Sequence, residues 1–437
     1  MNEIKVGLIG LGTVGTGVAR ILLEQSEKIY NRLGARIALK KVADIDVKRK
    51  RDVRLPKGVL IQDAQELLND PEIGIVVELI GGTTTAKKYI LRALKNGKHV
   101  VTANKALLST CGEEIFNEAI KRSIEIGFEA SVGGGIPLLK SIKEGLAANR
   151  FSDIYAIING TSNYILTRMG EEKRSFSDVL SEAQAKGYAE ADPTLDVGGI
   201  DSAHKLSILL LLSFGVILKP SDIPTDGIKT ILPLDMEFAK DFGYKIKPLA
   251  IARQRKDGRV EAKVHPTMIP AGTMLASVDG VYNAVHLIGD AVGSMIFIGR
   301  GAGMMPTASA VVSDLVDIAK RIMYGGAGRT TPYSFIKKAV KKADLVSINE
   351  QECRYYLRFF VVDRPGVLAR IASCLGRFGV SIESVIQKWR NTRGGVPIVI
   401  VTHKALERSL MKALKAIDSL DVVLSKSAFI RIEDGVV

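Results

Sequence analysis

Three glycines near the start of the chain, Gly10, Gly12 and Gly15, are spaced as G-x-G-x-x-G between a short apolar run and a helix-like segment. The apolar run, residues 4–9, is partly β-branched, which suits a strand buried on both faces. Aliphatic residues then recur at helical spacing. Such a strand, turn and helix form the first half of a dinucleotide-binding unit, with the phosphates held at the helix amino terminus. This context favours a dinucleotide site over a glycine turn without a ligand.

Strand and helix patterns continue to alternate over the first third of the chain. Residues 35–46 predict a second strand that ends at Asp44, and residues 73–82 and 98–101 predict two more buried strands. A further strand is expected to run to Glu129. The alternation predicts a doubly wound parallel sheet, and so an α/β dinucleotide-binding domain of the Rossmann type over residues 1–135.

The sequence gives conflicting signals about the coenzyme. Asp44 stands where an acid at the end of the second strand usually accepts the ribose hydroxyl of NAD. The basic run of residues 48–51 follows and would attract the extra phosphate of NADP. We therefore predict NADP or NAD without choosing between them. The predicted cofactor-binding residues are Gly10, Gly12, Thr13, Val14, Gly15, Asp44, Thr83, Lys105 and Gly303.

Composition limits where the protein works and what it binds. Hydrophobic residues make up 46% of the 437 residues, enough for two or three domains with ordinary cores. The three cysteines have neither metal-ligand spacing nor an even framework, so we expect free thiols in a reducing cytoplasm. No signal peptide is visible, and the apolar run 206–218 is too short to span a membrane. The net charge of +14 comes without a nucleic-acid-binding motif, so we expect no nucleic acid and no membrane partner.

The rest of the chain predicts two more domains. Residues 136–300 suggest an α+β domain with a mixed or antiparallel, half-exposed sheet. The glycine turn and amphipathic helix of residues 300–330 are expected to complete the first domain. After a linker over residues 331–350, residues 351–437 follow the order β-α-β-β-α-β of a ferredoxin-like domain.

A cluster of acids precedes a lysine in the middle domain. Asp201 and Lys205 are four residues apart in a helical segment and so share one face. Glu190, Asp192 and Asp196 precede them in a loop, and together these acids could anchor a substrate ammonium group. An exposed ion pair is the simpler interpretation from spacing alone. However, the helix runs directly into a very apolar segment, which favours a site at the mouth of a buried region.

Lys105 follows the end of a buried strand, where α/β sheets bind ligands. We interpret His204, between the acids and Lys205, as structural, and Met304 and Met305 as packing residues.

The chain resembles a known family in six runs that occur in the same order. The runs are GLIGLGTVG, VVTANKALLS, EASVGGGIP, NGTSNYIL, GYAEADPTLDVGGIDSAHKL and GRGAGMMPTASAVVSD. They resemble homoserine dehydrogenase, and the likeness covers residues 1 to about 329. The segment from Tyr355 onward looks like an ACT domain, which bacterial members often carry. No aspartate-kinase domain precedes Met1, so the monofunctional type is expected.

The resemblance implies an activity and a set of site residues. The family reduces L-aspartate 4-semialdehyde to L-homoserine with NAD(P)H, in threonine, methionine and isoleucine biosynthesis. It implies that Lys205 and Lys105 are catalytic. It also implies that residues 136–300 form a substrate-binding and dimerisation domain and that the protein is a homodimer or homotetramer. The implied substrate-binding residues are Glu190, Asp196 and Asp201, and the implied ligands of a monovalent cation, often sodium, are Glu129, Val132, Gly134 and Ile136.

Our own hypothesis is that the segment from Tyr355 onward senses a pathway amino acid, with threonine as the favoured effector, because the turn of residues 362–366 opens onto a helix whose amino terminus can receive a carboxylate. A segment that only dimerises is the alternative.

Two other functions remain compatible with these patterns. Another amino-acid dehydrogenase on a similar fold would need different substrate anchors. A non-catalytic sensor would bind NAD(P) and report amino-acid levels through its last domain. The presence of both Lys105 and Lys205 together with the acids weighs against the sensor.

Overall fold

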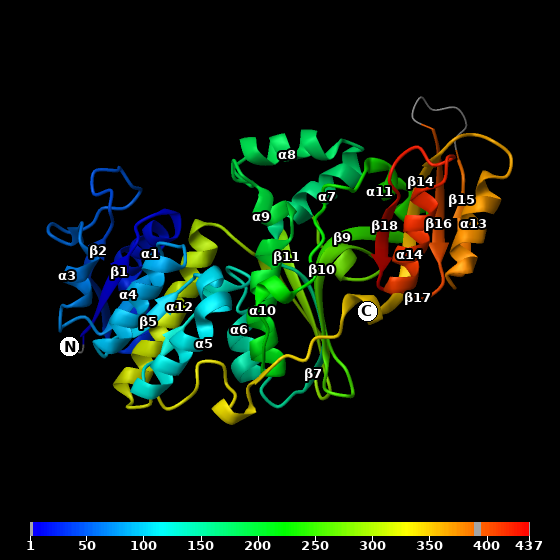
Figure 1. The fold of residues 1–437 in the computed structure, drawn as a ribbon. Helices are drawn as coiled ribbons and strands as arrows, with labels where there is room; N and C mark the ends of the chain where they lie inside the picture. The colour runs from blue at the N-terminus through cyan, green and yellow to red at the C-terminus, as the bar shows by residue number, and fades with distance from the viewer. Residues whose placement is uncertain (1–2, 389–394, 437) are drawn as a thin grey trace. The chain divides into compact units, whose positions relative to one another are not determined.

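The computed structural model describes residues 3–388 and 395–436, and Figure 1 shows its helices and strands. The chain forms two compact units, and each is assembled from three separate stretches of sequence. The first unit contains Met1–Phe151, His204–Asp222 and Ile288–Ala343, and the second contains Ser152–Ala203, Ile223–Leu287 and Asp344–Val437.

A six-stranded parallel sheet forms the centre of the first unit. Its spatial order is β3-β2-β1-β4-β5-β6, the order of a Rossmann sheet. Neighbouring strands run parallel, as the early alternation of strands and helices predicted. The strands are β1 (Glu3–Ile9), β2 (Arg36–Ala43), β3 (Leu60–Ile61), β4 (Ile75–Glu78), β5 (His99–Thr102) and β6 (Ile126–Gly127).

The helices of this unit come from distant parts of the sequence. They include α1 (Thr13–Glu24), α2 (Ser26–Leu33), α3 (Ala64–Leu68), α4 (Thr84–Lys95), α5 (Lys105–Arg122), α6 (Leu138–Lys140), α12 (Met304–Met323) and most of α10 (Ile200–Phe214). Helix α12 packs closely on α1, because a Cβ atom on Gly17 would lie 2.9 Å from the Cβ of Ala308. The unit also contains β12 (Gly293–Arg300) and a short parallel pair, β8 (Val216–Ile217) with β13 (Lys341–Lys342).

The predicted strand that ends at Glu129 is wrong in its extent. Strand β6 stops at Gly127, and a single 3-10 turn, Glu129–Ser131, follows. The backbone N–H of Glu129 donates to Asp314 Oδ2 at 2.9 Å instead of to a neighbouring strand. This hydrogen bond to a side chain on α12 replaces the strand ladder and ends the sheet.

One continuous sheet runs through the second unit. Its strands lie in the order β11-β7-β9-β10-β18-β14-β16-β15. They are β7 (Phe151–Ile157), β9 (Tyr244–Gln254), β10 (Val260–Pro270), β11 (Tyr282–Gly289), β14 (Glu352–Val361), β15 (Ile382–Ile386), β16 (Val396–Thr402) and β18 (Ala428–Ile432). The helices of this unit are α7 (Gly160–Glu172), α8 (Phe176–Ala185), α9 (Thr194–Val197), α11 (Pro233–Asp241), α13 (Val367–Arg377) and α14 (Glu407–Asp418).

The last four long strands, with α13 and α14, form a ferredoxin-like domain whose sheet extends that of the substrate domain. Strand β18 pairs with β10 in parallel, with Thr267 opposite Arg431 and Met268 opposite Ile432. The sheet is therefore mixed. The half-exposed sheet that the sequence suggested is wrong for β10, because ten of its eleven residues are buried.

Buried ion pairs accompany this junction. Arg431, 5% exposed in its side chain, contacts Glu407 on α14 and Asp226 of the substrate domain, the latter at 2.7 Å. Glu433 accepts from Arg253 at 2.5 Å and lies 3.1 Å from Lys263 on β10. Buried charges of this kind are tolerated only when they are paired, so the C-terminal strand is held by both apolar packing and charge.

Within residues 3–388 and 395–436, no helix combines the length and the apolar character needed to cross a bilayer. The apolar segment that begins at Leu206 instead forms the buried core of α10.

Candidate active site

The glycine turn has the geometry of a pyrophosphate site. Gly10 has φ +97°, a conformation that side chains disfavour. A Cβ on Gly15 would lie 2.0 Å from the carbonyl oxygen of Gly10, so the helix can begin this close to the strand only with glycine there. Gly12, in contrast, has open space where a Cβ would point. In this motif the first glycine permits the turn, the second leaves room for the ligand and the third lets the helix pack close to the strand. Gly10, Gly12 and Gly15 have the geometry that these roles require.

The first turn of α1 leaves its backbone amides available to a ligand. Thr13 and Val14 are the first two residues of the helix, after Gly12 at the N-cap position. No side chain caps this end, and its first turn holds no acidic residue. An uncapped helix amino terminus with no competing carboxylate suits a phosphate group.

Asp44 follows β2 and lies against the glycine turn. Its Oδ2 accepts from the backbone N–H of Leu11 at 2.6 Å, and its Oδ1 lies 2.9 Å from a guanidinium nitrogen of Arg51. Arg51 also donates to the carbonyls of Leu11, Asp46 and Arg49. Of the basic run, residues 48–50 are exposed, whereas Arg51 is folded back onto Asp44.

A buried polar network supports the start of α5, where Lys105 is the first helical residue. Asn104 caps the helix by accepting from the N–H of Leu107 at 3.1 Å, and it donates to the carbonyl of Gly82. Thr102 donates to Glu78 Oε2 at 2.7 Å. Burial raises the pKa of Glu78, although these hydrogen bonds oppose the shift. Thr83 follows Gly82, at the N-cap of α4, and is exposed.

Helix α10 carries Asp201 and Lys205 one turn apart. Both side chains are largely buried, with exposures of 6% and 9%. The side chain of His204, which lies between them in the sequence, points toward α5, and its Nδ1 lies 2.6 Å from Ser109 Oγ. His204 is therefore a link between two helices, consistent with the structural role that the sequence suggested.

Asn159 joins two of the predicted substrate acids. Its side-chain amide donates to Asp196 Oδ1 at 2.7 Å and to Asp201 Oδ2 at 2.9 Å. Its oxygen also accepts from the N–H of Ser162 and so caps α7. The structure thus brings Asp196 and Asp201 together within the second unit, through a residue that the sequence analysis did not single out.

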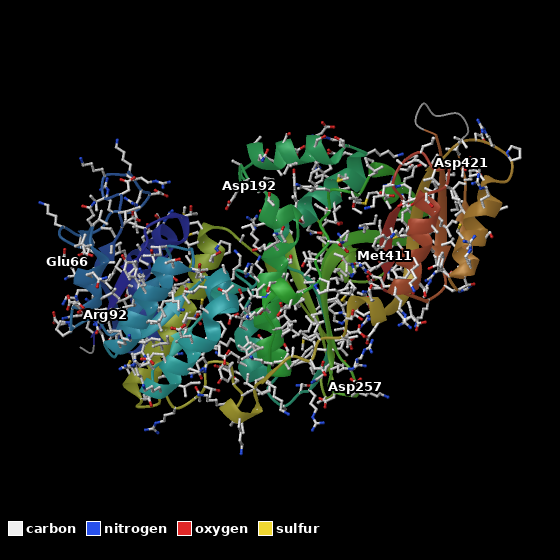
Figure 2. All side chains as sticks on the ribbon, in the orientation of Figure 1. Glu66, Arg92, Asp192, Asp257, Met411 and Asp421 are labelled. Atoms are coloured by element: carbon white, nitrogen blue, oxygen red, sulfur yellow. The ribbon has the colours of Figure 1, made fainter. Side chains whose placement is uncertain are left out.

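The other acids lie further out in the loop between α8 and α9. Glu190 is exposed, and Gln184 donates to its backbone carbonyl at 3.1 Å. Asp192, labelled in Figure 2, accepts from the hydroxyl and the N–H of Thr194. These bonds lower the pKa of Asp192. The carboxylate of Asp192 therefore accepts hydrogen bonds from a neighbour two residues along the chain.

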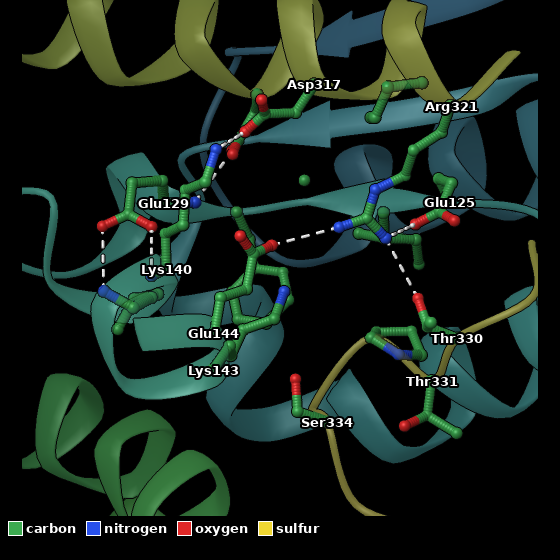
Figure 3. A pocket seen from close by; sticks show the side chains of 17 residues that line it. Glu125, Glu129, Lys140, Lys143, Glu144, Asp317, Arg321, Thr330, Thr331 and Ser334 are labelled. Atoms are coloured by element: carbon green, nitrogen blue, oxygen red, sulfur yellow. Dashed lines mark hydrogen bonds and ion pairs between the residues drawn. The ribbon is translucent and has the colours of Figure 1, made fainter. Parts of the chain in front are cut away.

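The predicted cation ligands lie in the loop after β6. Both carboxylate oxygens of Glu129 accept backbone N–H groups, from Leu139 at 2.8 Å and Lys140 at 2.7 Å, as Figure 3 shows. The loop then packs against the turn before α12, because the N–H of Gly135 donates to the carbonyl of Arg300. The carboxylate of Glu129 thus stabilises α6, and carbonyl oxygens of the same loop are the remaining hard donors.

Val132 and Ile136 are buried, and a Cβ on Gly134 would lie 2.3 Å from the carbonyl oxygen of Gly301. Gly303 is the N-cap of α12, with φ +122°. Across the described residues, no group of three or more His, Cys, Asp or Glu side chains is arranged to hold a metal.

A polar cavity of about 190 Å³ adjoins this loop and is drawn in Figure 3. Asp314, Asp317 and Arg321 line it from α12. Burial, together with the nearby charge of Glu129, raises the pKa of Asp314 to about 7. Burial lowers the pKa of Lys143, whose ammonium group lies 5.1 Å from the centre of the Phe128 ring. Both shifts favour the neutral forms of these two side chains.

Some residues of the site were missed from the sequence. The sequence could have predicted Asn159 as an N-cap, because Asn is a common signal for the start of a helix. It could not have predicted the two carboxylates that Asn159 contacts. Glu78 and Ser109 had no such signal, since each acts through partners 24 and 95 residues away.

Comparisons with known proteins agree with this geometry. Three family models match: the NAD-binding domain of homoserine dehydrogenase over residues 10–129, homoserine dehydrogenase over residues 137–316, and the ACT domain over residues 355–419. A homoserine dehydrogenase of Pseudomonas aeruginosa is 44% identical over 436 residues, which is 99% of each chain.

Solved structures of homoserine dehydrogenases are also similar to this chain. A homoserine dehydrogenase from Thiobacillus denitrificans is 42% identical, with a TM-score of 0.92 over 99% of each chain. A hyperthermophilic archaeal homoserine dehydrogenase in complex with NADPH is 25% identical, with a TM-score of 0.61 over 72% of this chain and 97% of its own.

Proposed function

The chain belongs to the homoserine dehydrogenase family, and from this premise we propose how its own residues carry out the reaction. The enzyme reduces L-aspartate 4-semialdehyde to L-homoserine in threonine, methionine and isoleucine biosynthesis. NAD(P)H, when bound at the glycine turn, supplies the hydride. What the chain itself must do is bind the amino acid, orient its aldehyde and protonate the oxygen.

Lys205 is the proposed proton donor to the alkoxide that forms when hydride adds to the aldehyde carbon. An ammonium group suits this role because it can lose a proton at working pH, whereas a guanidinium cannot. Lys105, the first residue of α5, is the second proposed catalytic lysine, and its positive charge would stabilise the developing oxyanion. The observation that supports these roles best is the position of Lys205 one turn from Asp201, in a nearly buried stretch of α10.

Asp201, Asp196 and Glu190 are the proposed partners of the substrate ammonium group. The bridge from Asn159 to the first two acids supports this role, because it holds two carboxylates side by side and orients them. A cation between them would relieve their mutual repulsion. Glu190 is the most exposed of the three, which suits a residue that contacts substrate on entry.

For the coenzyme, we propose that both NAD and NADP bind. The ion pair with Arg51 offsets the charge of Asp44 and so weakens its repulsion of a 2′-phosphate. The residues that would hold the coenzyme are those predicted from the sequence, from Gly10 to Gly15 with Asp44, Thr83, Lys105 and Gly303. The NADPH bound by the archaeal relative supports this proposal. Asp44→Ser should increase affinity for NADP, and an unchanged affinity would mean that Asp44 does not face that ribose.

A monovalent cation such as sodium is proposed at the loop after β6. Glu129, Val132, Gly134 and Ile136 would hold it, chiefly through backbone carbonyls, because the Glu129 carboxylate already accepts two amides. Activity measured in sodium and in a bulky organic cation at equal ionic strength should differ if the ion matters.

Regulation and assembly complete the proposal. Threonine is the proposed effector of the ACT domain, received at the start of α13, where no side chain caps the helix. Threonine at millimolar concentration should inhibit the full-length enzyme, and an unaffected rate would overturn this assignment. We also propose a homodimer or homotetramer, and a cytoplasmic location in keeping with the free thiols of Cys111, Cys353 and Cys374.

The direct test follows NAD(P)H absorbance with aspartate semialdehyde as substrate. Lys205→Ala should lower turnover by about a hundredfold to ten-thousandfold with coenzyme binding intact. Lys205→Arg should not restore it. Near-native turnover in Lys205→Ala would refute the assigned role.

A further inference from the structure

Ser109 and His204 link the two helices that carry the proposed catalytic lysines. Ser109 lies one turn after Lys105 on α5, and its hydroxyl is 2.8 Å from the carbonyl oxygen of Lys105. The same hydroxyl is 2.6 Å from Nδ1 of His204, which directly precedes Lys205 on α10. We propose that Ser109 and His204 are positioning residues that set Lys105 and Lys205 relative to each other. This inference rests on the roles proposed above for the two lysines.

The serine hydroxyl has one proton, and the backbone carbonyls of Lys105 and Ala106, at 2.8 Å and 3.2 Å, can only accept it. When the hydroxyl donates to one of these carbonyls, His204 donates to Ser109 through Nδ1–H; in the other tautomer the hydroxyl donates to Nδ1. In both arrangements one hydrogen bond between the side chains links α10 to the first turn of α5.

The surrounding packing makes this link important. A cavity of about 220 Å³ adjoins it, lined by residues of α5 and α10 that include Leu108, Ser109, Ser207 and Leu211. Residues of the segments 217–219 and 333–340 also line this cavity, so the space on this side of the hydrogen bond is not filled by side chains of the two helices. The hydrogen bond supplies a directional contact that this packing lacks. Since a displacement of about 1 Å at a reacting group can cost a hundredfold in rate, such a contact bears on catalysis.

The first test replaces the serine. Ser109→Ala should lower kcat by about tenfold to a hundredfold, with KM for the semialdehyde and coenzyme affinity within roughly twofold of the wild type. Thr110→Ala is the matched control, because Thr110 is the next residue on α5 and its hydroxyl bonds only carbonyls and a thiol of that helix. The control should retain wild-type kcat. Equal rates for Ser109→Ala and Thr110→Ala would overturn the proposal.

The second test examines the histidine and its coupling to the serine. His204→Asn places an amide donor near the position of Nδ1 and should recover much of the rate that His204→Ala loses. Because both residues act through one bond, the double variant Ser109→Ala with His204→Ala should be no slower than the worse single variant. Losses that multiply would mean that the two residues act independently. A lowered thermal midpoint with unchanged kcat would assign the pair a purely structural role and refute the inference.

The turnover of the two lysine variants distinguishes an error in the lysine roles from an error in the positioning role. If Lys105→Ala and Lys205→Ala retain turnover, the catalytic assignment is wrong whatever the pair does. If those variants lose turnover while Ser109→Ala keeps it, the lysine roles stand and the positioning role is wrong.

Discussion

At the scale of single residues, the site depends on side chains whose importance comes from their partners. The spacing of Asp201 and Lys205 predicted that they share one helix face, whereas their roles in the site were implied by the family resemblance. Asn159 and Glu78 could not be predicted in this way. Their partners are distant in sequence, and only the folded chain brings them together.

Asn159→Ala should raise KM for the semialdehyde by about tenfold while coenzyme affinity stays unchanged. The variant loses the two hydrogen bonds that orient Asp196 and Asp201, each with a charged acceptor and worth about 1.5–3 kcal/mol in comparable cases. It also loses a helix cap, so Ser175→Ala is the control, since Ser175 caps α8 and contacts neither acid. Steady-state kinetics check the prediction, and an equal KM in both variants would contradict it.

Glu78→Gln should flatten the dependence of stability on pH. Burial raises the pKa of Glu78 above its unfolded value of about 4.5, so folding favours the protonated form. The stability that this preference contributes is complete below that value and is lost as pH rises through the folded pKa. Glutamine imitates the protonated acid and should keep the contribution at all pH values. Thermal midpoints between pH 4 and 9 test this, and parallel curves for the variant and the wild type would refute it.

At the scale of elements, the opening strand, turn and helix were predictable because three local signals agree. Apolar content, glycine spacing and helical periodicity all lie within twenty-five residues, and the structure confirms them. The prediction of a strand up to Glu129 was wrong, because the backbone N–H of Glu129 donates to a side chain on α12 and not to a neighbouring strand. The prediction of a half-exposed sheet was wrong for β10, because ten of its eleven residues are buried and the residue alternation within β10 does not reveal what covers its second face.

Gly12→Ala separates coenzyme binding from folding. Its φ of −73° suits alanine and nothing lies within 4 Å of the new methyl group, so the thermal midpoint should stay within about 2 °C of the wild type. The methyl group would nevertheless occupy the space in which the pyrophosphate is expected to approach, so the Kd for coenzyme should rise at least about tenfold. Fluorescence titration with NADH and NADPH measures this. Gly15→Ala is the contrasting variant and should disrupt folding, because its methyl group meets a backbone oxygen.

At the scale of the whole molecule, the ferredoxin-like domain is part of the architecture of the substrate domain. One core cluster contains Ile246 and Met268 of the substrate domain together with Tyr356, Val401 and Ile432 of the C-terminal domain. Arg358 and Tyr356 both bond Asp235 on α11, at 2.7 Å and 2.8 Å. A shared core and shared buried charges mean that strain in one domain reaches the other directly.

Arg431→Met should destabilise the fold by about 3–5 kcal/mol, because it leaves Glu407 buried without its cation. Arg370→Met is the matched control on the same domain. Arg370 pairs with Asp421 at the surface, where both side chains are well exposed, so its loss should cost less than about 1 kcal/mol. Urea unfolding of both variants measures the difference, and equal stabilities would refute the importance of the buried pair.

Strand β10 cannot pair with β18 until almost the whole chain has been synthesised. Residues 260–270 form β10, but the partner strand comes from residues 428–432, so about 160 residues are synthesised between them. At roughly 5–20 residues per second, the nascent chain carries an open strand edge for about 10–30 s. During that interval Thr267 and Met268, the residues of β10 that pair with β18, lack their partner strand and are available to other chains. Chains that terminate before residue 428 would keep that edge permanently and become substrates for proteolysis.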